Sequence, residues 1–324
     1  MTENHEPLKD GALRFGLIGA GRWGRVYIET LRRIDDVVLT RLASRNPASA
    51  ALAGPDCLTT PDWREVAEAT DIDAVIVATP PALHAEMTRA AVAADLPVLV
   101  EKPLTLDRGE AEALYDFARA EGGLVLVGHT HLFHPAYRKL KKRARTLGHA
   151  TAIRATAGAR GPYRADTPVL WDWGSHDVAL CMDLLGRMPE TATASRLDTR
   201  RTEEGLGEVL RLTLAFSEGV GAAIEVGNLM TERRRRFEAY FEGGMLAYDD
   251  TVDDKLVHYP EATAPGTPLG PARSIPLDAT LPLTCAVTEF AAAARAGAPE
   301  LASLRLGADV VAVLDQCQKL LTSS

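Results

Sequence analysis

Residues 13–24 read LRFGLIGAGRWG, and this stretch decides the fold class. The apolar run Leu13–Gly19 predicts a buried strand, and Gly19, Gly21 and Gly24 fit the GxGxxG pattern of a tight strand-to-helix turn. Glycines let a ligand approach the backbone, and the N–H groups at the helix start attract a pyrophosphate. The turn therefore predicts dinucleotide binding, with a plain tight turn as the alternative.

Short apolar runs alternate with amphipathic stretches from Leu13 to Gly128. Strands without polar alternation are covered on both faces, so this pattern predicts a doubly wound parallel α/β sheet, a Rossmann domain over residues 10–128. The expected strands are Leu13–Gly19, Val37–Ala43, Asp73–Ala78, Pro97–Val100 and Leu124–Val127, and the expected helices are Trp23–Arg33, Asp62–Ala69, Pro81–Ala94 and Asp107–Glu121.

The second half, residues 129–324, reads as strand-like segments joined by turn residues such as Glu242-Gly243-Gly244. It predicts an α+β domain with a large, mostly antiparallel open sheet, and its C-terminal helices are candidates for packing back on the first domain. Arg233–Arg236 is expected to mark a solvated strand edge, with an anionic site as the alternative. The expected strands are Ala150–Thr156, Thr191–Asp198, Gly207–Phe216, Val220–Asn228, Arg235–Phe241, Met245–Tyr248 and Lys255–Tyr259, and the expected helices are Phe133–Thr146, Val178–Leu185, Thr284–Ala296 and Leu304–Leu321.

The composition of the chain argues against several classes of protein and site. The chain has 324 residues and a net charge of -8, which argues against a general nucleic-acid surface. Its four cysteines are scattered without paired spacing, so neither a disulfide framework nor a metal site is predicted. The polar start Met1–Leu13 and the lack of any apolar stretch of about 18 residues predict a soluble, cytoplasmic protein without a membrane anchor.

The end of the second predicted strand indicates which dinucleotide binds. NAD-binding units usually carry an acidic residue there for the ribose hydroxyls, whereas this chain has Ser44 and Arg45. A hydroxyl and a guanidinium can both bind a 2′-phosphate, so NADP is preferred and NAD is possible. The alternative is a solvated Arg45 and a pocket indifferent to the phosphate.

Two further strand ends face the expected ligand crevice. Pro80 and Pro81 stiffen the turn that begins at Thr79, and His84 follows near the start of a helix, as a structural or a cofactor-contacting residue. At the next strand the apolar run stops at Glu101-Lys102-Pro103, which places an ammonium group at the carboxyl end of a buried strand.

A second group of polar residues lies around Asp172 and His176. Four residues apart, they share one face if the segment is helical, and histidine suits proton transfer near neutral pH. An N-capping Asp172 and a structural His176 are the alternatives. Trp171 and Trp173 are candidates for stacking on a sugar ring or for the core. Candidates for an acidic substrate group, or else solvated loop residues, are Arg160, Tyr163 and Arg164.

The order and spacing of these motifs over nearly the whole chain resemble the Gfo/Idh/MocA family of oxidoreductases. The resemblance implies that Lys102 lies beside the nicotinamide and the substrate, that Asp172 and His176 act on the substrate hydroxyl, and that the Lys102–Pro103 bond is cis. It also implies a homodimer or homotetramer built on the C-terminal sheet. The chain departs from the common pattern at Ala179, where many members carry an aspartate, and in residues 166–171.

The resulting functional hypothesis is hydride transfer between NADP and a hydroxyl or carbonyl carbon of a sugar, cyclitol or sugar derivative. The alternatives are a nonsugar carbonyl or diol as substrate, and a binding protein that senses NADP without chemistry. The expected cofactor-binding residues are Gly19, Gly21, Arg22, Trp23, Gly24, Ser44, Arg45, Thr79, Pro80, His84, Glu101 and Lys102.

Overall fold

The computed structural model describes residues 11–322, and the chain divides into two compact units. Unit 1 contains the described residues up to 105, together with 109–128 and 283–305. Unit 2 contains residues 106–108, 129–282 and the described residues from 306 onward. The polar start that the sequence analysis considered, residues 1–10, lies outside the described residues. No helix within residues 11–322 has the length and apolar character to cross a membrane.

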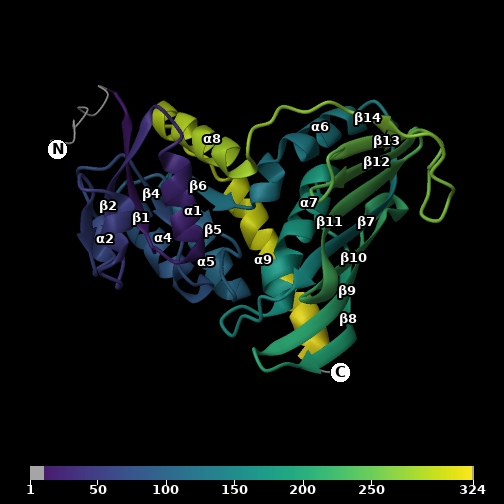
Figure 1. The fold of residues 1–324 in the computed structure, drawn as a ribbon, viewed down its shortest axis with the longest axis horizontal. Helices are drawn as coiled ribbons and strands as arrows, with labels where there is room; N and C mark the ends of the chain where they lie inside the picture. Colours follow the sequence, from purple (N-terminus) through teal and green to yellow (C-terminus); the bar gives the residue numbers. More distant parts are fainter. Residues whose placement is uncertain (1–10, 323–324) are drawn as a thin grey trace. The chain divides into compact units, whose positions relative to one another are not determined.

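Unit 1 is built on a parallel six-stranded sheet in the order β3-β2-β1-β4-β5-β6 (Figure 1), which confirms the predicted doubly wound sheet. The order reverses between β1 and β4, and in such sheets ligands bind at the carboxyl ends of the strands beside this switch point. The strands are β1 (Leu13–Ile18), β2 (Val37–Ala43), β3 (Leu58–Thr60), β4 (Ala74–Val77), β5 (Val98–Glu101) and β6 (Val125–Gly128).

Helices follow the strands of unit 1, as the period of the apolar residues predicts. One of them comes from the end of the chain, since Phe290 of α8 packs edge-on against Phe15 of β1 with ring centroids 5.8 Å apart. The helices are α1 (Arg22–Leu31), α2 (Ser49–Ala53), α3 (Arg64–Ala67), α4 (His84–Ala93) after the 3-10 turn η1 (Pro81–Leu83), α5 (Arg108–Ala120) and α8 (Pro282–Ala296).

Unit 2 is built on an eight-stranded sheet in the order β14-β13-β12-β11-β7-β10-β9-β8. Only β7 and β10 pair in parallel, so the predicted antiparallel character is confirmed. The strands are β7 (Ala150–Arg160), β8 (Thr191–Arg201), β9 (Leu206–Ala215), β10 (Gly221–Gly227), β11 (Leu229–Phe241), β12 (Gly244–Asp249), β13 (Leu256–Tyr259) and β14 (Arg273–Ser274).

The helices of unit 2 are η2 (Thr130–Phe133), α6 (Pro135–Ala144), η3 (Leu170–Gly174), α7 (Ser175–Leu185) and α9 (Ala302–Thr322), whose first residues, 302–305, belong to unit 1. The helix expected at Val178 begins eight residues earlier, at Leu170, with one π-helical turn. The backbone N–H groups of Trp171 and Asp172 both donate to the Pro168 carbonyl oxygen, which starts this turn.

The expectation of a solvated edge at Arg233–Arg236 is wrong. β11 lies between β12 and β7 inside the sheet, and Arg235 is only 4% exposed. Along a strand, successive side chains point to opposite faces, so Arg234 is exposed while Arg235 faces the covered side. The alternation within the run was masked by its uniform charge.

Candidate functional site

The glycine-rich turn of unit 1 requires glycine at its first and last positions. Gly19 has φ of 102°, and a Cβ there would lie 2.6 Å from the Ala78 carbonyl oxygen of the neighbouring strand end. At Gly24 a Cβ would collide with the Gly19 carbonyl oxygen. The two glycines therefore let β1, α1 and the end of β4 approach closely, as the dinucleotide pattern requires.

The start of α1 fits a pyrophosphate. Gly21 is the N-cap without a side-chain hydrogen bond, and no acidic residue occupies the first helical turn. A Cβ at Gly21 would meet no heavy atom within 4 Å, so the space over the backbone is open. Arg22 is exposed and Trp23 half-buried beside it. Free N–H groups and the positive end of the helix dipole face this space, the arrangement that binds dinucleotide phosphates.

The residues after β2 provide two polar groups and no carboxylate. The Ser44 hydroxyl lies 2.9 Å from the Ser49 hydroxyl and accepts a 3.2 Å hydrogen bond from the Asn46 N–H. Arg45 is exposed and makes no hydrogen bond or ion pair within the part of the chain that the structure describes. The guanidinium is available to an anion at the end of this strand.

His84 joins the loops that follow β4 and β5. The ring is fully buried, with Nδ1 2.9 Å from the Pro103 carbonyl oxygen and Nε2 2.8 Å from the Thr79 carbonyl oxygen. Burial lowers the pKa of His84, and the hydrogen bonds to these carbonyls oppose that effect. Its geometry is that of a buried tie between two loops at the crevice, with Pro80 in one of them.

Hydrogen bonds within unit 1 fix the position of the Glu101-Lys102-Pro103 segment. The expected cis Lys102–Pro103 bond is confirmed. Glu101 is 4% exposed; one of its oxygens accepts a 2.7 Å hydrogen bond from the Tyr27 hydroxyl and the other accepts from the Lys102 N–H. Burial raises the pKa of Tyr27, and the negative charge of Glu101 raises it further, so the phenol stays a donor. Glu101 thus fixes the backbone that carries Lys102, itself 8% exposed.

In unit 2, Asp172 lies in the π-helical turn and His176 in the first turn of α7. His176 is 8% exposed. The Asp172 carboxylate is paired with Arg164, Nη1 to Oδ1 3.5 Å, and Arg164 also forms a bidentate pair with Asp166. The loop before η3 therefore contributes a cation that steadies the Asp172 carboxylate.

Two histidines that the sequence analysis did not select lie against His176. The rings of His131 and His176 are perpendicular with centroids 4.9 Å apart, and His129 lies 6.3 Å from His176. His131 Nδ1 is 2.9 Å from the Tyr248 hydroxyl at the end of β12. Burial raises the pKa of Tyr248, with Asp250 adding to the shift, so this hydroxyl keeps its proton. The fold thus brings a second imidazole to the candidate base.

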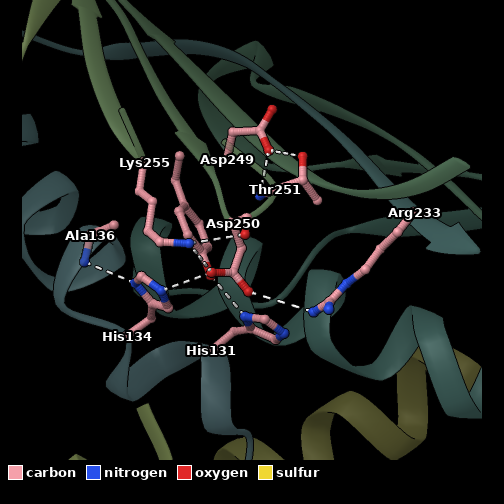
Figure 2. A network of polar contacts seen from close by, with 9 residues as sticks. His131, His134, Ala136, Arg233, Asp249, Asp250, Thr251 and Lys255 are labelled. Atoms are coloured by element: carbon pink, nitrogen blue, oxygen red, sulfur yellow. Dashed lines mark hydrogen bonds and ion pairs between the residues drawn. The ribbon is translucent and has the colours of Figure 1, made fainter. Parts of the chain in front are cut away.

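A network around Asp250 anchors the segment that carries these histidines (Figure 2). His134 Nδ1 accepts from the Ala136 N–H, which leaves the proton on Nε2 to donate to Asp250 Oδ1 at 3.2 Å. Lys255 donates to the same oxygen at 2.9 Å, and Arg233 lies 3.8 Å from the other. Burial raises the pKa of Asp250, but the His134 and Lys255 hydrogen bonds outweigh it and hold the pKa below its usual range. His131, within η2, is thereby held against Tyr248 at the end of β12.

An ion pair inside unit 2 attaches α7 to the sheet. Arg235 Nη1 lies 3.0 Å from Asp177 Oδ2, and their side chains are 4% and 1% exposed. The guanidinium also lies 5.9 Å from the centroid of a Trp173 ring. Burial raises the pKa of Asp177, while the charge and hydrogen bond of Arg235 lower it. Since Asp177 follows His176 directly, this pair fixes the turn that carries the candidate base.

The remaining predicted substrate residues have different environments. Trp171 is 4% exposed and donates its indole N–H to Gln318, so it belongs to the core. Tyr163 packs against the backbone of Gly205 and Gly207. Arg160 is exposed at the end of β7. Of the two tryptophans only Trp173 is half-buried and keeps an accessible surface.

Comparisons with known proteins show the family to which the chain belongs. The profile described as an oxidoreductase family with an NAD-binding Rossmann fold matches residues 13–129, and that of the GFO/IDH/MocA C-terminal domain matches residues 137–247. Inositol 2-dehydrogenase 4 of Saccharopolyspora erythraea is 31% identical over 244 residues, 72% of this chain and 72% of that protein. The chain belongs to the GFO/IDH/MocA oxidoreductase family.

Other relatives of this GFO/IDH/MocA chain are more varied. The 4-carboxy-2-hydroxymuconate-6-semialdehyde dehydrogenase of Sphingobium is 28% identical over 231 residues, 63% of this chain and 72% of that protein. A crystal structure from Magnetospirillum magnetotacticum MS-1, of a protein named as an oxidoreductase, superposes with a TM-score of 0.89 at 45% identity, over 94% of this chain and 99% of that one. The resemblance inferred from the motifs is confirmed.

The family assignment makes the missed residues easier to place. Tyr27 and His131 each contact a residue that the motifs indicated, yet neither is next to its partner in the sequence. Arg164, predicted as a candidate for an acidic substrate group, pairs with Asp172. The signal for Tyr27 and His131 was weak: a tyrosine inside an amphipathic helix and histidines at residues 129–134 beside a predicted helix start. The spacing His129, His131 and His134 was the one available hint of a polar cluster.

Proposed function

We propose that this GFO/IDH/MocA protein is an NADP-dependent dehydrogenase or reductase acting on a hydroxyl or carbonyl carbon of a cyclitol, sugar or sugar derivative. The observation that carries the proposal is the buried Lys102 at the end of β5, held by Glu101, in the same unit as a glycine turn that fits a dinucleotide. Unit 1 is the dinucleotide-binding domain and unit 2 the substrate and oligomerisation domain.

In this proposal each polar residue has a defined task. His176 takes the proton from the substrate hydroxyl in oxidation and returns it in reduction. The Lys102 ammonium stabilises negative charge that develops on the same oxygen. Asp172, steadied by Arg164, orients the substrate or the histidine. The nicotinamide, when bound, accepts or supplies the hydride.

Replacing Lys102 by methionine keeps much of the aliphatic stem and removes the charge. We expect kcat to fall by about 10²–10³-fold, the usual cost of losing one electrostatic group aimed at the reacting oxygen, while the cofactor Kd stays within a few-fold. The measurement is steady-state turnover with fluorescence titration of the reduced cofactor. Lys319→Met, which alters an exposed lysine of α9, serves as the control. Turnover near wild type in Lys102→Met would exclude the role.

Arg45 is proposed to bind the 2′-phosphate of NADP, with Ser44 beside it. Arg45→Ala should weaken NADP binding about tenfold, because one charge-assisted contact is lost, and leave NAD binding unchanged. The measurement is the ratio of the two dissociation constants. Arg33→Ala, an exposed arginine beyond the end of α1, is the matched control. An unchanged ratio in Arg45→Ala would contradict the assignment.

The substrate class is tested by a screen of cyclitols, sugars and sugar nucleotides, read at the absorbance of the reduced nicotinamide with NADP and NAD. A nonsugar carbonyl is the second candidate, because the Sphingobium relative is named for a semialdehyde substrate. Turnover confined to nonsugar carbonyls would replace the first candidate. Cofactor binding without turnover of any compound would favour a sensor.

We also propose that unit 2 forms a homodimer or homotetramer through its sheet. In β9 and β10 exposed residues alternate with buried ones, and most of β8 is exposed, so one face of these strands is open in the single chain. Leu197 and Leu206 are among the exposed apolar residues of these strands. Sedimentation or light scattering gives the molar mass, and a monomer at micromolar concentration would exclude this arrangement.

A further inference from the structure

A cavity of about 470 Å³ lies within unit 2, and none of its lining residues is assigned to catalysis. One wall is α6, which contributes Lys139, Lys142 and Arg143, and Thr146 follows the helix. These residues are spaced i, i+3, i+4 and i+7, so they share one helical face. His258 of β13, Arg273 of β14 and Ile275 line it as well. The volume is within the usual range for small-molecule sites.

Four cations converge on this cavity, and no carboxylate lines it. Within residues 11–322, Lys139, Lys142, Arg143 and Arg273 form no ion pair, although most cations of the surrounding segments do. Lys139 donates only to the Pro276 carbonyl oxygen, at 2.7 Å, which leaves its charge uncompensated. In a chain with net charge -8, such a concentration of unbalanced positive charge favours a multiply charged anion.

The helix itself explains part of this charge. Cations in the last turn of a helix interact well with its dipole, which accounts for Lys142 and Arg143. It does not account for Arg273, which comes from another element and pairs directly with His258 in the sheet ladder. Lys141 shows the ordinary case, since it turns away from the cavity and pairs with Asp183 at 2.8 Å. The cations of the cavity therefore converge from two separate elements.

The cavity also offers groups for an organic body. His258 is 7% exposed, and its Nε2 lies 3.1 Å from the Gly243 carbonyl oxygen. The proton of a neutral ring is thus used at Nε2, and Nδ1 is left as an acceptor for a hydroxyl. Ile275 and the aliphatic stems of the lysines supply apolar surface. Phosphate recognition combined with a hydroxyl acceptor and apolar walls is characteristic of sites for sugar-like phosphate esters.

We propose that this cavity, formed by α6 and β13–β14, binds a small phosphate ester of a hydroxyl-bearing molecule, through residues other than the catalytic ones. The cations hold the phosphate groups, and His258 and Ile275 contact the organic part. None of the lining residues belongs to the proposed catalytic or cofactor-binding set, so the site goes beyond the proposed function.

ADP and inorganic pyrophosphate are suitable probes, titrated calorimetrically into the full chain saturated with NADPH or NADH so that the glycine turn is occupied. We expect one additional binding event for ADP, tighter than for pyrophosphate. Lys142→Ala/Arg143→Ala should weaken it on the order of tenfold or more, since two charge-assisted contacts are lost. Arg145→Ala/Arg234→Ala, which removes two exposed arginines that do not line the cavity, should leave it unchanged.

The outcomes separate the proposal from its competitors. Absence of a second event, or an event that Lys142→Ala/Arg143→Ala does not weaken, overturns it. Equal weakening in both double variants would show attraction by net charge alone and also overturns it. If pyrophosphate binds as tightly as ADP, the contact with the organic part is wrong. Failure of NADPH to bind would contradict the proposed function without affecting the comparison of the two variants.

Discussion

Replacing His176 by asparagine is expected to lower kcat by about 10²–10⁴-fold, the range in which a positioned general base contributes. Asparagine approximates the shape of the imidazole and keeps a hydrogen-bonding side chain in the first turn of α7, so binding should change less than turnover. His176 is 8% exposed and lies against His131, whose ring is fixed by Tyr248. The surroundings are therefore ordered before any substrate arrives, and the loss should appear in the chemical step.

The measurement is kcat across the pH range with an identified substrate, together with a primary isotope effect on hydride transfer. The limb of the pH profile that reports the base should disappear in His176→Asn. His149→Asn, which alters an exposed histidine of unit 2, is the matched control. A variant with an unaltered rate and pH profile would require another base, and His131 is then the next residue to test.

Replacing Arg235 by methionine should destabilise the protein by about 3–5 kcal/mol, because removing one partner of a buried ion pair leaves the other charge uncompensated. Asp177 is 1% exposed, and its second oxygen, Oδ1, has no hydrogen-bond partner within the described residues. It has no alternative donor once the guanidinium is gone. Chemical denaturation followed by circular dichroism measures the loss, and Arg234→Met on the exposed face should stay within about 0.5 kcal/mol of wild type.

The pH dependence of this loss of stability distinguishes an uncompensated charge on Asp177 from a cavity left by the missing guanidinium. Burial raises the pKa of Asp177, and without Arg235 the opposing effect of the guanidinium is lost. A carboxyl whose pKa is higher in the folded state than in the unfolded state binds its proton preferentially in the folded state. Protonation therefore stabilises the folded protein, and stability is regained as the pH falls. The deficit of Arg235→Met should therefore shrink as the pH is lowered from neutral toward the ordinary pKa of an aspartate, about 4. Arg235→Met/Asp177→Asn should recover much of the loss, and a pH-independent deficit would indicate a cavity.

Local sequence pattern predicted the elements that are long or uniformly apolar. β4 and β6 follow short apolar runs and are buried along their whole length. β3 was missed because its three residues are partly exposed and have no apolar run. The early start of the helix at Leu170 was missed because Pro168 and Gly174 read as breakers, whereas Pro168 accepts the first hydrogen bonds of the helical turn.

Only those residues of the candidate site that belong to one short motif were predictable from the sequence. The glycine turn and Glu101-Lys102-Pro103 are local patterns with a family resemblance behind them. The Tyr27 bond to Glu101 and the Arg235 pair with Asp177 join residues 74 and 58 positions apart. Such contacts depend on how helices cover the sheets, and a single sequence carries no direct signal for them. The uniform charge of Arg233–Arg236 even pointed away from the buried position.

The single imidazole of His84 has a mechanical consequence for the nucleotide crevice. The His84 ring contacts the backbone carbonyl oxygens of both Thr79 and Pro103, so one side chain connects the loops that follow β4 and β5. A displacement of either loop is transmitted to the other, and amide exchange in the two should slow or quicken together.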